Sequence, residues 1–152
     1  MTCEFCELTN EDFKDLLFTS DDWKVFLSKD QTYLGRSIVV LNRHTGSLSD
    51  LYPEEWMALQ SAIIKIESVY RRLLGAQLFN WTCLMNDAFK QAEPQPHVHL
   101  HVRPRYAIPP MIEDNAYPDP NFGHHYQSHP IKELSAYERE RLLFRLREAF
   151  QI

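Results

Sequence analysis

Residues 97–106 have the sequence His97-Val98-His99-Leu100-His101-Val102-Arg103-Pro104-Arg105-Tyr106. Side chains alternate between the two faces of an extended strand, so this spacing places His97, His99 and His101 on one face. The aliphatic residues between them enter the core. Three of the chain's seven histidines therefore stand in one row, about 7 Å apart.

Such a row suits two kinds of chemistry. His-x-His on a strand can present two ring nitrogens to one metal ion, with a water completing the shell. A neutral imidazole, with an ordinary pKa near 6.5, can instead attack phosphorus and then act as a leaving group. A third interpretation, a polar strand face that happens to be rich in histidine, fits the strict period of two poorly. The row alone leaves the metal centre and the nucleophilic site both open.

The segments around this row predict an α+β fold. Strands are expected at Trp23–Leu27, which alternates, at Ser37–Leu41, which is β-branched, and at 78–85, which is rich in aromatic residues. Apolar residues recur every three or four positions over Pro53–Leu74, which predicts a long helix. A second helix is expected from Ser135, where Glu138 completes a capping box, to Phe150. The first strand connections are too short for crossovers, so the sheet should be largely antiparallel.

Length and composition exclude several classes of protein. A chain of 152 residues and 18.0 kDa with 44% hydrophobic residues fits one domain with a sizeable core. No apolar run exceeds four residues, so neither a membrane span nor an export signal is expected. With 16 Lys and Arg against 21 Asp and Glu, the net charge is −5, which disfavours nucleic acid as a partner. The three cysteines are expected to be reduced thiols or metal ligands, and the protein to be cytoplasmic.

The histidine row and the Arg-Pro-Arg-Tyr after it resemble the signature of the histidine triad (HIT) nucleotide hydrolases and transferases. The resemblance covers roughly residues 3–106 and includes these further positions in order: Cys3-Glu-Phe-Cys6, Phe26-Leu27, Gly35, Asn42-Arg43-His44, Leu51 to Glu55, and Asn86. It implies a five-stranded antiparallel sheet with one long helix, paired as a homodimer. Residues 1–106 would form the HIT domain, and residues 107–152 a C-terminal extension of the same domain.

The resemblance also implies an activity. The chain would be a nucleotide hydrolase or nucleotidyltransferase, similar to diadenosine polyphosphate hydrolases, that acts at the α-phosphate of a nucleoside polyphosphate or nucleotide conjugate. His99 would attack the phosphorus to form a nucleotidyl-histidine, which water or phosphate resolves, and His101 would contact the phosphate. The alternative is a nucleotide-binding module with little or no turnover.

The resemblance to the zinc-bearing branch of this family transfers four metal ligands to Cys3, Cys6, His44 and His97. Two thiolates and two imidazoles make a closed tetrahedral shell, which marks a structural zinc. The alternative is two reduced surface cysteines and an unrelated loop histidine. A catalytic metal centre built on the three histidines would leave Cys3, Cys6 and His44 without a joint explanation. Cys83 is expected in the core.

By the same resemblance, Asn86 is expected near the phosphates. Several other positions at this expected phosphate site depart from the family pattern. Arg36 stands where many relatives have a histidine, and its guanidinium can bind phosphate but cannot accept a proton. Glu93-Pro94 replaces the usual Gln-Ser or Gln-Thr, so Lys90, Gln91 or Gln95 must substitute as donor.

Two features near the C-terminal end of the row allow two interpretations each. Arg103 replaces an apolar residue, which places it either beside an anionic ligand or at a solvated strand end. The turn-rich segment 117–126, with its aromatic residues and two histidines, forms either a lid over the nucleotide or a tail packed on the sheet.

Overall fold

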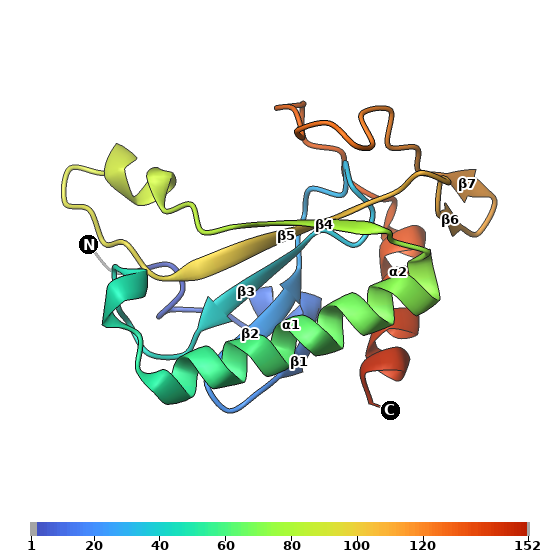
Figure 1. Cartoon of the computed structure of the whole chain (residues 1–152). Helices are drawn as coiled ribbons and strands as arrows, with labels where there is room; N and C mark the ends of the chain where they lie inside the picture. The colour runs from blue at the N-terminus through green and yellow to red at the C-terminus, as the bar shows by residue number, and fades with distance from the viewer. Residues whose placement is uncertain (1–2, 152) are drawn as a thin grey trace.

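The computed structural model describes residues 3–151 and is built around a five-stranded antiparallel sheet with the order β1-β2-β3-β5-β4 (Figure 1). Its strands are β1 (Leu16–Thr19), β2 (Trp23–Leu27), β3 (Ser37–Leu41), β4 (Leu78–Thr82) and β5 (His99–Arg105). A separate hairpin consists of β6 (Met111–Ile112) and β7 (Asn115–Ala116). The predicted α+β class and antiparallel sheet are confirmed.

Two helices pack on this sheet, α1 (Pro53–Leu74) and α2 (Ala136–Phe150), and three short 3-10 helices lie in the connections: η1 (Asp12–Asp15), η2 (Leu48–Asp50) and η3 (Asn86–Lys90). Helix α1 begins at Pro53, whose fixed φ suits a first helical position, and ends before Gly75 at a φ of 75°. Helix α2 follows the Ser135 cap. Both predicted helices are therefore confirmed.

Alternation along the strands separates the two faces of the sheet. Val39 and Leu41 of β3 join the hydrophobic core beneath α1, whereas Ile38 and Val40 line a cavity on the opposite face. On the α1 side, the indole of the fully buried Trp23 donates to a helix carbonyl, Nε1 to the oxygen of Glu55 at 2.9 Å. Because α1 runs along one face (Figure 1), the other is left for a site.

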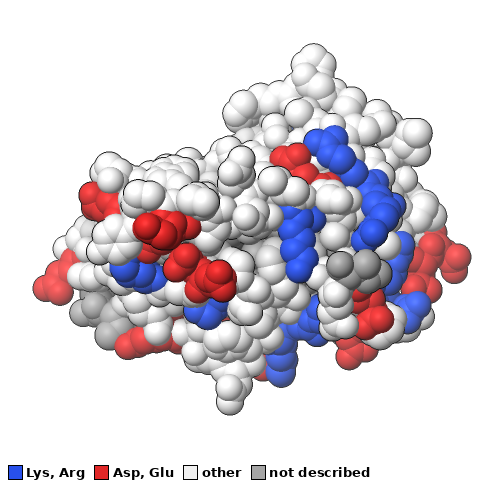
Figure 2. All heavy atoms as spheres, turned by 60° about the horizontal axis from the view of Figure 1, so that its bottom comes forward, with Lys and Arg blue, Asp and Glu red and all other residues white. Residues whose placement is uncertain are grey.

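The structure differs from the sequence prediction at three strands. Strand β1 was not predicted, β4 ends at Thr82 instead of Met85, and β5 begins at His99, so His97 precedes the strand. No helix within residues 3–151 is long and apolar enough to span a membrane. On the face shown in Figure 2, basic side chains have acidic side chains among and beside them.

Candidate active site and metal centre

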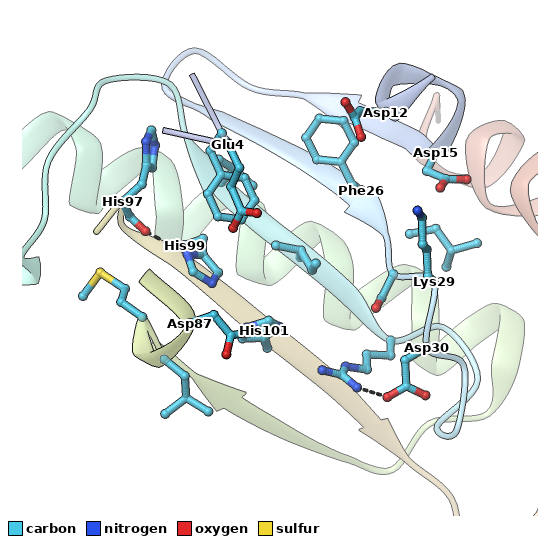
Figure 3. A pocket seen from close by; sticks show the side chains of 18 of the residues that line it. Glu4, Asp12, Asp15, Phe26, Lys29, Asp30, Asp87, His97, His99 and His101 are labelled. Atoms are coloured by element: carbon cyan, nitrogen blue, oxygen red, sulfur yellow. Dashed lines mark hydrogen bonds and ion pairs between the residues drawn. The ribbon is translucent and has the colours of Figure 1, made fainter. Parts of the chain in front are cut away.

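The candidate active site lies on the sheet face opposite α1. His99 and His101 extend from β5 onto this face, where their register partners on β3 are Val40 and Ile38. All four residues line a cavity of about 670 Å³, a size typical of small-molecule sites. Figure 3 shows the two imidazoles side by side in this cavity.

The ring of His99 is held by two contacts. Its Nδ1 lies 2.8 Å from the carbonyl oxygen of His97, and the ring of Phe5 packs on it with 4.6 Å between centroids. A carbonyl oxygen only accepts hydrogen bonds, so Nδ1 carries the proton. Nε2 of His99 therefore holds a lone pair, as a nucleophilic imidazole must.

The surroundings of His101 keep it neutral. Burial, and then the charges of His99, Arg36 and Arg103, lower the pKa of His101 to about 3, while Asp87 acts in the opposite direction. Nδ1 of His101 is buried and has no hydrogen-bond partner within residues 3–151. At neutral pH this ring can therefore offer a hydrogen bond to a ligand without carrying a full charge.

Four side chains form a candidate metal centre. The ligand atoms of Cys3, Cys6, His44 and His97 all lie within 4.8 Å of one another. Nδ1 of His97 is 3.3 Å from Sγ of Cys3 and 3.2 Å from Nδ1 of His44, and Sγ of Cys6 is 3.4 Å from the same His44 atom. Around a tetrahedral zinc with its usual bond lengths, two nitrogens are about 3.3 Å apart and nitrogen and sulfur about 3.6 Å apart. The four residues therefore fit a tetrahedral metal site.

Hydrogen bonds outside the cluster orient its ligands. Nε2 of His97 donates to the carbonyl oxygen of Leu41 at 2.7 Å, so the lone pair on Nδ1 faces the thiols. The backbone N–H groups of Cys6 and Glu7 donate to the carbonyl of Cys3, which forms a tight turn between the two thiols. With His97 engaged by the cluster, His99 and His101 are the two triad histidines that lie outside it.

The predicted nucleotide-binding residues fall into two groups. Asn86 and Arg36 line the cavity, and so does Gln95. Lys90 and Gln91 are exposed at the end of η3 and are not among the described residues that line the cavity. The structure thus brings Asn86 and Arg36 to the triad and leaves Lys90 and Gln91 outside.

The sequence allowed Arg103 to be a solvated strand end, and the structure excludes this interpretation. The residue is 7% exposed, its Nη1 donates to Oγ1 of Thr82 at 3.1 Å, and its guanidinium carbon lies 4.1 Å from the ring centroid of Tyr126. It also lines the cavity, as Arg36 does. The arginine is buried because the C-terminal tail folds over this end of β5.

The tail is fixed by a buried ion pair that the sequence did not reveal. Nε of Arg105 lies 2.6 Å from a carboxylate oxygen of Asp119, and both side chains are almost fully buried. Arg105 also donates to the carbonyl oxygens of Asn121 and His124. None of the described residues 117–126 lines the cavity of its own chain, and this segment packs on the sheet. No sequence signal identified Asp119 as the partner of Arg105.

Comparison with known proteins gives a family and a fold. The sequence matches the HIT domain family over residues 9–108. No curated protein matches the sequence.

Solved structures share the fold at low sequence identity. A hypothetical histidine triad nucleotide-binding protein from Sulfolobus tokodaii is 18% identical, with a TM-score of 0.67 over 98% of this chain and 92% of that chain. A zinc-bound histidine triad family protein from Mycobacterium smegmatis is 22% identical, with a TM-score of 0.55 over 90% and 83% of the two chains. A uridylyltransferase is 17% identical, with a TM-score of 0.62 over 99% of this chain and 45% of that chain. At these identities the likeness establishes the fold.

Proposed function

Because the chain belongs to the HIT domain family, we propose that it is a nucleotide hydrolase or nucleotidyltransferase that acts at the α-phosphate of a nucleoside polyphosphate or nucleotide conjugate. The observation that carries the proposal is the hydrogen bond between Nδ1 of His99 and the carbonyl of His97. It leaves the Nε2 lone pair available in a cavity large enough for a nucleotide. The neutral ring of His101, with its centroid 5.0 Å from that of His99, stands next to it as a phosphate contact.

In the proposed reaction, Nε2 of His99 attacks the α-phosphorus. The bond from phosphorus to the bridging oxygen breaks, its electron pair stays on the leaving group, and a nucleotidyl-histidine forms. Water or phosphate then attacks the same phosphorus, and the bond to Nε2 breaks to restore the neutral ring. His101 and Asn86 would donate hydrogen bonds to the phosphoryl oxygens as these gain charge.

We propose that Cys3, Cys6, His44 and His97 hold a structural zinc. A shell of two thiolates and two imidazoles has no open position for substrate, so a bound ion would cross-link the N-terminal segment to the sheet. The fit of the four ligand atoms to a tetrahedron and the zinc-bound relative support this assignment. The proposal requires a reducing compartment such as the cytoplasm, because the thiols must stay reduced.

The homodimer is proposed on the apolar surface of α1. Met57 and Ile64 are 70% and 63% exposed and lie about two turns apart on one helix face. A second copy of this chain would cover them.

A departure near the triad favours a second candidate function, a nucleotide-binding module with little turnover. Pro94 has no N–H to donate, and Lys90 and Gln91 lie away from the cavity. Of the residues expected to replace the missing donors, Gln95 alone lines the described cavity. The leaving group would then receive weak assistance.

Incubation with diadenosine tetraphosphate separates the two candidates. We expect wild type to form AMP and ATP, and His99→Ala to be slower by roughly a thousandfold, because the nucleophile is lost. His129→Ala is the matched control, since His129 is exposed and does not line the cavity, and it should retain the wild-type rate. Calorimetry with AMP should give similar affinities for all three proteins.

Two results would contradict the enzymatic proposal. If wild type binds AMP but forms neither product, the binding module is the correct candidate. If His99→Ala forms products at the wild-type rate, His99 is not the nucleophile.

A further inference from the structure

Two arginines form the row of the sheet directly beyond His101. The ladder between β3 and β5 pairs Ile38 with His101 and Ser37 with Val102. Continued by one residue, the same register places Arg36 opposite Arg103, and both side chains line the cavity. This row lies two residues from His101 along β5, about 7 Å farther from His99.

The two guanidinium groups are only partly neutralised by their protein contacts. Arg36 forms an ion pair with Asp30, whereas the contacts of Arg103 are the neutral Thr82 hydroxyl and the ring of Tyr126. Like charges directly opposite on neighbouring strands destabilise a sheet. Consistent with this, burial and then the charge of Arg36 lower the pKa of Arg103. A fold that keeps both charges here gains most when an anion binds between them.

Hydrogen-bonding capacity at this end also exceeds what the protein uses. Nε of Arg36 and Nδ1 of His101 are buried and have no partner within residues 3–151. Buried polar atoms nearly always have a partner, from protein, water or ligand. A guanidinium offers donors in a planar fork that suits phosphate oxygens. The uncommitted nitrogen atoms therefore point to an oxyanion at this place.

Apolar side chains line the part of the cavity beside His99. Phe5 packs on the ring of His99, and Val40 is the register partner of His99 on β3. The side chain of Glu4 also lines the cavity here (Figure 3). An aromatic base gains most from this end, because apolar surface is buried there. The nucleoside and the anionic part of a ligand would therefore lie on opposite sides of His99 and His101.

We infer that Arg36 and Arg103 form a second anion subsite that binds a phosphate of the leaving group. The preferred substrate is then a nucleotide whose leaving group carries phosphate, such as a nucleoside polyphosphate, and not an amine or an uncharged alcohol. This inference rests on the proposed function, and it deepens it by naming the substrate class.

The subsite would stabilise the negative charge that develops on the leaving group. When Nε2 of His99 bonds to the α-phosphorus, the pair of the broken bond stays on an oxygen of the departing phosphate. The positive charges of Arg36 and Arg103 stabilise the departing phosphate as an anion, so it can leave without first receiving a proton. An amine leaving group needs such a proton, and no guanidinium supplies one at neutral pH.

Binding of AMP and ATP to the His99→Ala protein tests the subsite without turnover. In calorimetry without added divalent cations, we expect ATP to bind at least tenfold more tightly than AMP, because its outer phosphates reach Arg36 and Arg103. Arg36→Gln and Arg103→Gln should each reduce this ratio by roughly tenfold while AMP affinity changes little. Arg141→Gln, which removes the same charge from an exposed position outside the cavity, should leave the ratio unchanged.

A second experiment measures turnover, in variants that retain His99. Arg103→Gln should lower kcat/KM for diadenosine tetraphosphate by at least tenfold and leave kcat/KM for adenosine 5′-phosphoramidate, whose leaving group is an amine, nearly unchanged. Arg103→Lys keeps the charge without the planar fork and should give an intermediate loss. It also serves if the glutamine variant does not fold.

The outcomes separate the subsite from the proposed function. An ATP-to-AMP affinity ratio that both arginine variants leave unchanged overturns the subsite, even where the wild type forms AMP and ATP. A fall in AMP affinity equal to that in ATP affinity also overturns it, because the arginines then bind the α-phosphate. Failure of the proposed function shows itself separately, as a wild type that forms no product or binds no AMP.

Discussion

His101 is a residue whose protonation the native state resists. Protonation would charge a buried ring, and would place that charge beside His99, Arg36 and Arg103, with Asp87 as the opposing carboxylate. The pKa of His101 is therefore about 3 in the folded protein, against 6.5 as its ordinary value. Below about pH 6.5 the unfolded chain binds the proton more readily, so His101 lowers the free energy of unfolding as the pH falls from 6.5 toward 3.

Replacement of His101 by asparagine should weaken this dependence. Between pH 7.5 and pH 5.0, we expect wild type to lose more free energy of unfolding than His101→Asn, by on the order of 1 kcal/mol after allowance for solvent screening. Urea unfolding at the two pH values measures the difference. Exposed His129 provides the control, and His129→Asn should follow wild type. Equal losses in wild type and His101→Asn would mean that the pKa of His101 is the same in the folded and unfolded protein.

At the scale of the elements, the first turn of α2 connects this helix to the C-terminal tail through hydrogen bonds. Glu138 accepts hydrogen bonds from the Ser135 hydroxyl at 2.6 Å, the Tyr117 hydroxyl at 2.6 Å and the Asn115 amide at 2.8 Å. The bonds from Ser135, then Tyr117 and Asn115, lower the pKa of Glu138 to about 2, from an ordinary 4.5. Since the folded pKa is the lower one, this stabilisation is complete above about pH 4.5 and is lost as the pH falls toward 2.

Glu138→Gln should therefore be destabilising at neutral pH and less so in acid. We expect a Tm about 3–6 °C below wild type at pH 7, from the loss of a charged acceptor for several donors. Thermal unfolding should show this difference narrowing between pH 5 and pH 3. Glu140→Gln removes an exposed carboxylate from the same helix and should change Tm little. A constant difference at all pH values would show that packing, and not the charge of Glu138, joins the tail to α2.

The same elements show what the sequence could predict. Helix α1 was bounded correctly because Pro53 and Gly75 are local start and stop signals, and α2 because Ser135 and Glu138 form a capping box. Strand β1 was missed because it is a four-residue edge strand whose pairing with β2 is irregular, so no alternation announces it.

The part of the candidate site that depends on residue spacing along one strand could be predicted from the sequence. The period of two placed His99 and His101 on one face, and the family resemblance named the cluster that the structure brings together. The register of β3 on β5, which sets Arg36 beside Arg103, depends on contacts between distant segments and has no local signal. The same is true of the tail that buries Arg103. The catalytic and binding roles of these residues stay predictions.

On the scale of the whole molecule, the metal centre joins segments far apart in the chain. Cys3 and Cys6 come from the N-terminal turn, His44 from the loop after β3, and His97 from the segment before β5. Phe5 lies between the two cysteines and packs on His99, so the same turn contributes one wall of the cavity. An ion in the cluster would therefore fix both the N-terminus and part of the nucleotide site.

Removal of the metal should consequently affect stability more than chemistry. We expect a zinc chelator to lower the Tm of wild type by roughly 10 °C, because a cross-link between the N-terminus and the sheet is lost. Cys3→Ser should start from the lower Tm and respond little to chelator, whereas Cys83→Ser, which changes the thiol outside the cluster, should respond as wild type does. Metal analysis should find one zinc per chain in wild type.

Below the Tm of the metal-free protein, kcat should persist while KM rises, because Phe5 loses its anchor but His99 keeps its hydrogen bond to His97. Complete loss of turnover in a metal-free protein that is still folded would instead assign the ion to the chemical step, and the cluster could not then be a closed structural site.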